Sequence, residues 1–257
     1  MDKSAKTNQS IEKTFHIIDI MAGAQVSMRL QDIAKKADLP ASTALRLLNT
    51  LQTLGYVNQD DSSLQYSLSL KFAKIGSMVS SKISIRELAR PYLTELSHKC
   101  QEAACLGIEQ DKDIVYIDVE HGPDNMLKIM QYIEKRAPMH CTGIGKLILS
   151  TYDENKLSEY IEEKGLLSFT PNTLVTKNAL LQELQVVRRN GYAIDNQECE
   201  LGTRCVAVDI KDYNNKIVAA ISVSGPISRM TPERLEVIRP WVVETADKIS
   251  QLLAYKS

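Results

Sequence analysis

The segment Gly143-Ile144-Gly145-Lys146 has the residue types of a loop that holds an anion. It fails the tests for a phosphate-binding P-loop, because His140 stands where the first glycine is needed and Leu147 where Ser or Thr is needed. A dinucleotide-binding turn needs glycine at position 148, which is Ile. Two interpretations remain: a helix start whose backbone N–H groups bind a carboxylate, or a tight turn that only begins a helix.

Thiol and carboxyl side chains gather in a second segment, which contains Asp195, Cys199 and Cys205. With His140 and Cys141 these could ligate zinc, but their spacings match no structural zinc motif. A cysteine nucleophile served by His140 would need an orienting residue, and none stands out. We expect no metal, no cofactor and no catalytic residue, with the cysteines as small groups that line a pocket. A cysteine-dependent small-molecule enzyme and a metal sensor are the alternatives.

Two short amphipathic helices lie within LQDIAKKADLPASTALRLLNTLQTLGYV, separated by Asp38-Leu39-Pro40. Gly55 ends the second helix. A short helix, a tight turn and a second helix have the spacing of a helix-turn-helix motif. The apolar side of the second helix is predicted to contain Leu45, Leu48, Leu51 and Leu54.

The opposite side of that second helix is polar and small. Arg46 can reach a guanine or a phosphate, and Asn49 can bond an adenine. In this motif the start of the second helix enters the DNA major groove. The alternative is an ordinary solvated helix face, but the turn, the leucines and the polar face together favour DNA. The predicted DNA-binding residues of this helix are Ser42, Thr43, Arg46, Asn49 and Thr50.

A hairpin is expected directly after this helix. Tyr56-Val57 and Tyr66–Leu68 read as two short strands around a polar turn, which would form the wing of a winged helix-turn-helix. Ser62 and Ser63 are the candidate DNA contacts. The acidic pair Asp60-Asp61 in the same turn would repel phosphate at the wing tip.

Two further helices flank this unit. The first is expected to be capped by Ser10 and closed by Gly23, with Ile11 and Phe15 on its apolar face. The second, over residues 69–83, carries an apolar stripe and reads as a linker helix that needs a partner surface. The stripe is Phe72, Ile75 and Val79.

Mixed strands and helices follow from residue 84 and predict an antiparallel α+β domain. Thr231 is expected to cap the last helix. The strands are predicted at 103–110, 113–121 and 127–133 and as a hairpin over 204–226, and the helices at 84–101, 144–152, 153–164, 177–190 and after 231.

The composition limits which partners and which cellular location are expected. The formal net charge is −1, so no global field points to nucleic acid or to a membrane surface. Residues 1–80 carry nine Lys and Arg against seven Asp and Glu, a net of +2, which has the sign of a DNA-binding head. The five cysteines include no C-x-x-C pair, the N-terminus has no apolar signal segment, and no apolar run is long enough to span a membrane. We therefore expect a cytoplasmic protein with reduced thiols and no membrane partner.

The chain resembles the IclR family of bacterial transcriptional regulators over nearly its whole length. The resemblance implies a winged helix-turn-helix over 1–68, a linker helix over 69–83 and a GAF-like effector-binding domain over 84–257. It also implies a homodimer or homotetramer that binds a palindromic operator. We expect ligand-controlled repression or activation of a catabolic operon, with repression as the favoured sign. The pattern is most similar to the sugar-acid-responsive members. The segments that carry the resemblance are the helix-turn-helix segment above, YSLSLKFAKIG, CTGIGKLILS, NGYAIDNQECELGTRCVAVDI and AAISVSGPISRMT.

The resemblance also implies where a small carboxylate effector, such as a keto or sugar acid, binds. Backbone amides at Gly143 and Ile144 would hold its carboxylate, and Asp195 and Cys205 would complete the polar contacts. Thr203 is a departure, since an apolar residue is commoner there, and it favours a more polar effector. Cys199 is a second departure that would line the pocket. The apolar walls would come from Ile129, Ala137 and Thr203.

Overall fold

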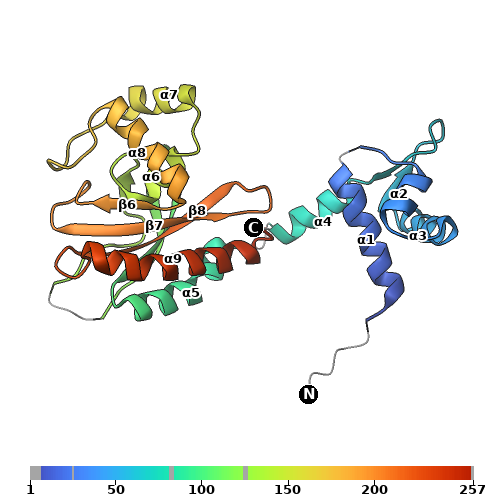
Figure 1. The fold of residues 1–257 in the computed structure, drawn as a ribbon, viewed down its shortest axis with the longest axis horizontal. Helices are drawn as coiled ribbons and strands as arrows, with labels where there is room; N and C mark the ends of the chain where they lie inside the picture. Colours follow the sequence, from blue (N-terminus) through green and yellow to red (C-terminus); the bar gives the residue numbers. More distant parts are fainter. Residues whose placement is uncertain (1–6, 25, 81–83, 124–126, 256–257) are drawn as a thin grey trace, which may run out of the picture. The chain divides into compact units, whose positions relative to one another are not determined.

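The computed structural model describes residues 7–24, 26–80, 84–123 and 127–255. Contacts divide the chain into two compact units, residues 1–83 and 84–257 (Figure 1). None of the helices in the described ranges is both long and apolar enough to cross a membrane.

The first unit packs three helices and a hairpin around a small core, with a fourth helix at its end (Figure 1). The two strands pair antiparallel, and Met28 adds a bridge to Tyr66. The predicted helix-turn-helix and wing are therefore present. The elements are α1 (Gln9–Ala24), α2 (Leu30–Lys36), α3 (Ala41–Thr53), β1 (Val57–Gln59), β2 (Tyr66–Leu68) and α4 (Lys71–Ser80).

The predicted leucine face of α3 is half wrong. Leu48 and Leu51 are buried, but Leu45 and Leu54 are 39% and 55% exposed. At about 100° per residue, a row of every third residue drifts around the helix, so the ends of a four-member row lie on opposite sides. Ala44 and Leu47 complete the buried face instead.

The boundaries of α1 also differ from the prediction. The Asn8 side chain accepts a hydrogen bond from the Ser10 amide at 3.0 Å, so Asn8 precedes the helix and Ser10 lies inside it. Gly23 does not end α1, which continues to Ala24. Ile11 and Phe15 are exposed rather than buried.

Helix α4 is fastened to the first unit at its start. The Phe72 ring lies 5.1 Å from the Tyr56 ring, and Lys71 donates to the Leu54 carbonyl at 2.8 Å. Ile75 and Val79 further along α4 are exposed, and positions 81–83 of the predicted helix lie outside the described residues.

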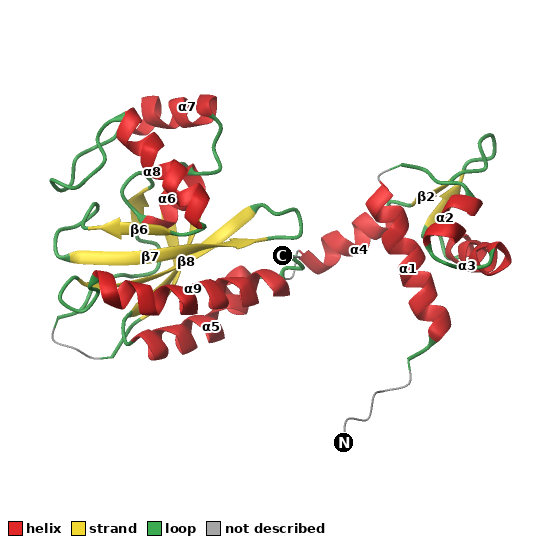
Figure 2. Cartoon of the chain, in the orientation of Figure 1, coloured by secondary structure: helices red, strands yellow, loops and turns green. Residues whose placement is uncertain are grey.

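The second unit is one six-stranded antiparallel sheet in the order β5-β4-β3-β8-β7-β6, covered by helices on both faces (Figure 2). Its strands are β3 (Ala103–Gln110), β4 (Asp113–Glu120), β5 (Arg136–Pro138), β6 (Ala193–Asn196), β7 (Thr203–Lys211) and β8 (Ile217–Pro226). Its helices are α5 (Ile85–Cys100), α6 (Gly143–Leu149), α7 (Glu154–Lys164), α8 (Lys177–Asn190) and α9 (Pro232–Leu252). Thr231 caps α9 as predicted, accepting from the Arg234 amide at 3.2 Å.

The strand predicted at 127–133 is wrong, because the described part of this segment is a loop before β5. Leu127, Met130 and Tyr132 are at least 60% exposed, so its apolar side chains do not pack into the sheet. The short edge strand β6 was not predicted.

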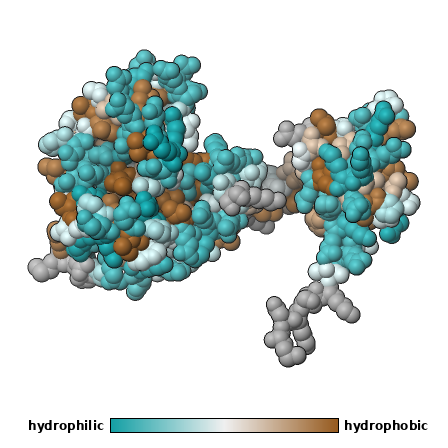
Figure 3. Space-filling model, viewed as in Figure 1, coloured by the Kyte–Doolittle hydropathy of each residue, from teal (hydrophilic) through white to brown (hydrophobic). Residues whose placement is uncertain are grey.

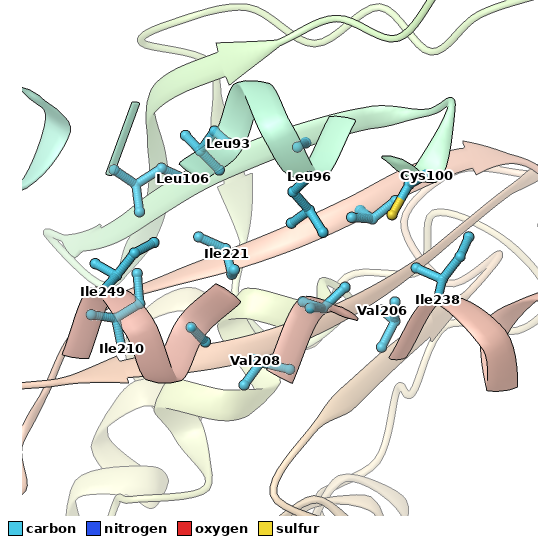
Figure 4. Close-up of a cluster of buried hydrophobic side chains, with 14 of the residues drawn as sticks. Leu93, Leu96, Cys100, Leu106, Val206, Val208, Ile210, Ile221, Ile238 and Ile249 are labelled. Atoms are coloured by element: carbon cyan, nitrogen blue, oxygen red, sulfur yellow. The ribbon is translucent and has the colours of Figure 1, made fainter. Parts of the chain in front are cut away.

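The alternation of side chains along β7 divides the core into two layers. Val206, Val208 and Ile210 point to α5 and α9, where they join the cluster drawn in Figure 4. Ala207 packs with residues of α6, α7 and α8 on the other face. Cys205 shares its strand face with Ala207, because successive side chains alternate, and so lies on the α6 side.

Candidate functional site

Five polar residues of α3 were predicted to meet DNA, and the structure places them on one side of the helix. Ser42, Arg46, Asn49 and Thr50 are exposed and Thr43 is half-buried. No described residue forms an ion pair with Arg46. A shallow groove runs along this side, and Leu45 and Thr53 add to its lining.

In the wing turn, Asp60 forms hydrogen bonds with the two serines that were predicted to contact DNA. Asp60 Oδ1 accepts hydrogen bonds from the hydroxyls of Ser62 at 2.6 Å and Ser63 at 2.8 Å, and from both backbone amides. The Ser62 hydroxyl and the Ser63 amide hold the pKa of Asp60 down to about 2. Both serine hydroxyls therefore donate within the turn, and must rotate before they can donate to a phosphate.

A cavity lies in the second unit on the α6 side of the sheet, with about 40 Å³ of free space. An open groove continues from it between residues 127–130 and 200–203. The free space holds a water molecule or two, so an acid of several carbons requires side chains at the mouth to move. All eight residues predicted from the resemblance line this cavity: Ile129, Ala137, Gly143, Ile144, Asp195, Cys199, Thr203 and Cys205.

The turn at Gly143 reaches the cavity because α6 begins directly against the sheet. Thr142 caps the helix, its hydroxyl accepting from the Gly145 amide at 3.2 Å. A side-chain carbon at Gly143 would lie 3.1 Å from Cys205 Sγ, so the glycine allows this close approach. Asp195 on β6 pairs with Cys205 on β7, which brings the acid and the thiol to the same place.

Asp195 is a buried acid. Its Oδ1 accepts from the Glu198 amide at 2.7 Å and from the Cys199 amide at 3.4 Å. Burial nevertheless raises the pKa of Asp195 to about 6, although these amides and the charge of Lys146 lower it. The cavity therefore contains a carboxyl group that gains a proton in mildly acidic solution.

Replacing Asp195 by asparagine should stabilise the second unit at pH 8 and not at pH 4. Because the pKa of about 6 lies above the ordinary 3.8, the acid contributes stability below pH 4 that is lost as the pH rises through 6. Asp195→Asn removes the charged form and should gain about 2–3 kcal/mol at pH 8. Urea unfolding followed by fluorescence reports this unit alone, because Trp241 is the single tryptophan.

The matched control is Asp247→Asn on the exposed side of α9. Because Asp247 is exposed, this substitution should change the free energy of unfolding far less than Asp195→Asn does at pH 8. An Asp195→Asn variant that is less stable than the parent at pH 8 would contradict the raised pKa.

Lys146 was not predicted as a site residue, yet it is fully buried beside the cavity. Its Nζ donates to Glu198 Oε1 at 2.6 Å, to Glu183 Oε1 at 2.8 Å and to the Ile194 carbonyl at 2.6 Å. Burial raises the pKa of Glu198 to about 7, although Lys146 lowers it. This ion cluster joins α6 to α8 and to the strand and loop that carry Asp195. A single charge inside the apolar run of α6 is the sequence signal that identifies it.

Several polar residues of the cavity were also missed. Ser222 and Ser224 pair with Ala207 and Cys205 across β8 and β7, so strand alternation places them on the cavity side. Once Cys205 was assigned to the cavity, the hairpin pattern could have predicted that Ser222 and Ser224 also face it. The missed lining residues are Tyr116, Gln131, Lys135, Thr142, Glu200, Arg204, Ser222 and Ser224.

The geometry gives no support to Cys205 as the nucleophile of the cysteine-enzyme alternative, whereas at Cys199 a hydrogen bond with Cys141 lowers the pKa of the thiol. Burial raises the pKa of the Cys205 thiol to about 12, so this thiol is not a nucleophile near neutral pH. His140 bonds the Leu167 carbonyl at 3.0 Å and the Tyr160 hydroxyl at 3.5 Å, and burial lowers its pKa. Within the described ranges, His, Cys, Asp and Glu side chains form no cluster of three that could hold a metal.

Comparison with known proteins identifies the family. The family model of the bacterial transcriptional regulator IclR C-terminal domain matches residues 77–251, and that of the IclR helix-turn-helix domain matches residues 10–61. The chain belongs to the IclR family. Its α+β fold class, with an N-terminal helix-turn-helix unit and a C-terminal effector-type unit, is confirmed.

Individual IclR-family proteins match over most of their length. The chain is 34% identical to the HTH-type transcriptional regulator XynR of Escherichia coli, covering 96% of this chain and 98% of XynR. It is 32% identical to the E. coli transcriptional repressor AllR, covering 98% and 93%. The crystal structure of Thermotoga maritima IclR aligns with a TM-score of 0.64 at 30% identity, over 96% of this chain and 99% of that one.

IclR-family regulators bind DNA and small-molecule effectors, and this chain is a DNA-binding transcriptional regulator rather than an enzyme. The predictions of the family and of the general function are confirmed. The individual DNA and effector contacts remain predictions.

Proposed function

We propose that this IclR-family regulator represses a catabolic operon and responds to a small carboxylate, such as a keto or sugar acid. The observation that carries the proposal is that the eight residues implied by the family resemblance, which come from several distant segments of the chain, line one cavity. Gly143 and Ile144 would hold the carboxylate, while Asp195 and Thr203 would meet polar groups of the ligand. The name of one relative, the repressor AllR, supports repression as the sign of control.

The DNA-binding form is proposed to be a dimer, or a dimer of dimers, on a palindromic operator in the cytoplasm. Apolar side chains reach the surface of the first unit and would have a second copy to pack against (Figure 3). We assign residues 1–68 to the DNA-binding domain, 69–83 to the linker helix and 84–257 to the effector domain. The exposed apolar side chains of α1 and α4 are Ile11, Phe15, Ile75, Met78 and Val79.

Replacing Arg46 by alanine should weaken operator binding by about 5- to 150-fold, the effect of losing one base or phosphate contact. The measurement is a mobility shift on the DNA upstream of the protein's own gene, at two salt concentrations. Gln52→Ala is the matched control, because Gln52 is exposed on α3 but lies outside the groove that contains Arg46. Undiminished binding by the Arg46 variant would remove this helix face from the DNA interface.

Replacing Asp195 by asparagine should weaken binding of the effector at least tenfold, since hydrogen bonds to a charged group are worth about 1.5–3 kcal/mol. Calorimetry with a panel of keto and sugar acids measures this. The acid that binds must also lower operator affinity, and operator DNA must lower its affinity by the same factor. Equal affinity in both proteins would exclude Asp195 from the site.

A further inference from the structure

Two of the five cysteines meet beside the cavity. The thiol of Cys141 donates a hydrogen bond to the sulfur of Cys199. Cys141 is buried directly before Thr142, which caps α6, whereas Cys199 is partly exposed in the loop between β6 and β7. Of the two, Cys199 belongs to the wall of the cavity. A small molecule that enters the cavity therefore meets Cys199 with a second thiol next to it.

The main chain around both cysteines is held in place. The residue before Cys199 accepts a hydrogen bond from the Thr173 hydroxyl at 2.7 Å through its carbonyl. Around Cys141, the Thr142 hydroxyl donates to the Pro138 carbonyl at 2.9 Å. The two sulfurs therefore meet between two anchored segments, one at the start of α6 and one after β6.

The two thiols differ in reactivity from the others. The hydrogen bond from Cys141 lowers the pKa of the Cys199 thiol, and burial only partly offsets it. Because the thiolate is the reactive form of cysteine, Cys199 is the thiol that an oxidant attacks first. Burial raises the pKa of the three remaining thiols to about 12: Cys100, Cys105 and Cys205.

The size of the cavity indicates which oxidant reaches this thiol. Its free space of about 40 Å³ holds a water molecule or two. Hydrogen peroxide is hardly larger than water and fits that space. A bulky oxidant such as a peptide disulfide does not fit unless the cavity opens. The chemical class that suits the site is therefore a small peroxide.

We propose that Cys141 and Cys199 are a peroxide-sensitive pair whose disulfide weakens effector binding. An acid of several carbons enters the cavity only if side chains at its mouth move. The disulfide would tie the stretch that contributes Cys199, Glu200 and Thr203 to the wall to the residue before the cap of α6. The effect on the effector rests on the proposed function, because it needs the cavity to be the effector site.

The oxidation takes place in two balanced steps. The Cys199 thiolate attacks one peroxide oxygen and the O–O bond breaks, which leaves a sulfenic acid on Cys199 and releases hydroxide. That hydroxide takes up the proton that Cys199 had lost and becomes water. The sulfur of Cys141 then attacks the sulfenic sulfur, the S–O bond breaks, and the hydroxyl leaves with the Cys141 proton as a second water. The two sulfurs thus supply the two electrons that reduce the peroxide.

Peptide mapping tests the bond directly. Trypsin places Cys141 on the peptide 137–146 and Cys199 on the peptide 190–204, each without a second cysteine. The reduced full chain is treated with a small excess of hydrogen peroxide, then unfolded and alkylated. These two peptides should be joined and lighter by two hydrogen atoms than their sum. They should lose their free thiols at least about tenfold faster than the peptides of the other three cysteines.

Three variants assign the roles of the two thiols. Cys141→Ser keeps a hydroxyl donor but no second sulfur, so the sulfenic acid of Cys199 should accumulate and be captured by dimedone. Cys199→Ser should give neither the disulfide nor the dimedone adduct. The matched control is Cys100→Ala in the cluster between α5, α9 and the sheet, which should form the same disulfide as the wild type. A thermal melt followed by circular dichroism checks that each variant is folded, and the wild-type map decides without them.

Calorimetry then compares the reduced and oxidised wild type after the peroxide has been removed. The probes are keto and sugar acids, including 2-oxobutyrate and D-gluconate. Oxidation should weaken the binding of the acid that the reduced protein binds at least about tenfold, and dithiothreitol should restore it.

Peptides that stay unlinked, or a disulfide between other cysteines, would overturn the inference whatever the effector is. A disulfide between Cys141 and Cys199 that leaves acid binding unchanged would also overturn it, because the bond would not control the cavity. Binding of no acid by the reduced protein would contradict the proposed function and the link to the effector with it, while the peptide map would still show whether the pair oxidises. The two failures are therefore distinguishable.

Discussion

Replacing Lys146 by methionine is expected to lower the free energy of unfolding of the second unit by about 3–5 kcal/mol, because it leaves a buried carboxylate without its cation. The loss of the cation destabilises the charged form of Glu198 most, because its side chain is 9% exposed while that of Glu183 is 31% exposed. Trp241 fluorescence in urea measures the loss.

Two further variants separate the missing cation from the missing bulk. Lys146→Met combined with Glu198→Leu removes both members of the buried pair and should recover at least half of the lost stability, because replacing a whole buried pair by apolar residues is often neutral. Lys248→Met removes an exposed partner of Glu244 and should lower the free energy of unfolding far less than Lys146→Met does, because solvent screens an exposed ion pair. If Lys146→Met and Lys248→Met are equally mild, the ion cluster does not stabilise the fold.

The loss should extend to effector binding. Lys146 holds the Ile194 carbonyl and Glu198, and Asp195 lies between them in the chain. In the double variant, stability returns but the loop loses its anchor. We therefore expect the double variant to fold and to bind the effector more weakly than the wild type.

Replacing Gly145 by alanine is expected to have a comparably large effect. A side-chain carbon there would lie 2.2 Å from the Met139 Cα and 2.3 Å from its carbonyl oxygen, and the obstacle is backbone that cannot rotate away. The start of α6 would have to shift, with a loss of about 3 kcal/mol or more in the free energy of unfolding. The turn at Gly143 would shift with it, so effector binding should fall as well.

Gly76→Ala is the contrasting substitution. Gly76 lies inside α4 and an added carbon would meet nothing within 4 Å, so this change should stabilise the first unit by about 0.5–1 kcal/mol. Circular dichroism follows the helices of both units and Trp241 fluorescence follows the second alone, so a change in the dichroism transition without a change in the fluorescence transition reports the first unit. A Gly145→Ala variant as stable as the wild type would show that α6 does not pack as closely as described.

How much the sequence could predict depended on the kind of pattern. Helices with a cap and a clear apolar face, and the hairpin of β7 and β8, were predictable because their signals are local. The loop over 127–133 was misread as a strand because its apolar residues suggest β structure, while its exposure depends on the neighbouring loop and on Arg229. The prediction of the buried face of α3 was half wrong because two sets of apolar residues, spaced three or four apart, could each form that face. The sequence does not show which side of the helix the core approaches.

The cavity residues illustrate the same limit. Gly143, Asp195 and Cys205 were predicted through a family resemblance, since residues far apart in the chain meet only once the sheet is formed. Lys146 was missed because its role depends on burial: it is a charge surrounded by carboxylates. The burial of a charge cannot be predicted from the spacing of residues in the sequence.

The loop over residues 127–135 has a consequence for how such regulators diverge. The bonds that hold it in place end on main-chain groups, namely the carbonyls of Leu127, Met130 and Tyr116. Because these acceptor groups are present whatever the side chain, we expect substitutions along the loop to leave its path unchanged, except at Lys135, whose side chain donates one of these bonds. If the cavity is the proposed effector site, mutation of this loop can alter which metabolite is recognised without first destabilising the protein, so a duplicated copy of the gene could acquire a new inducer in single steps.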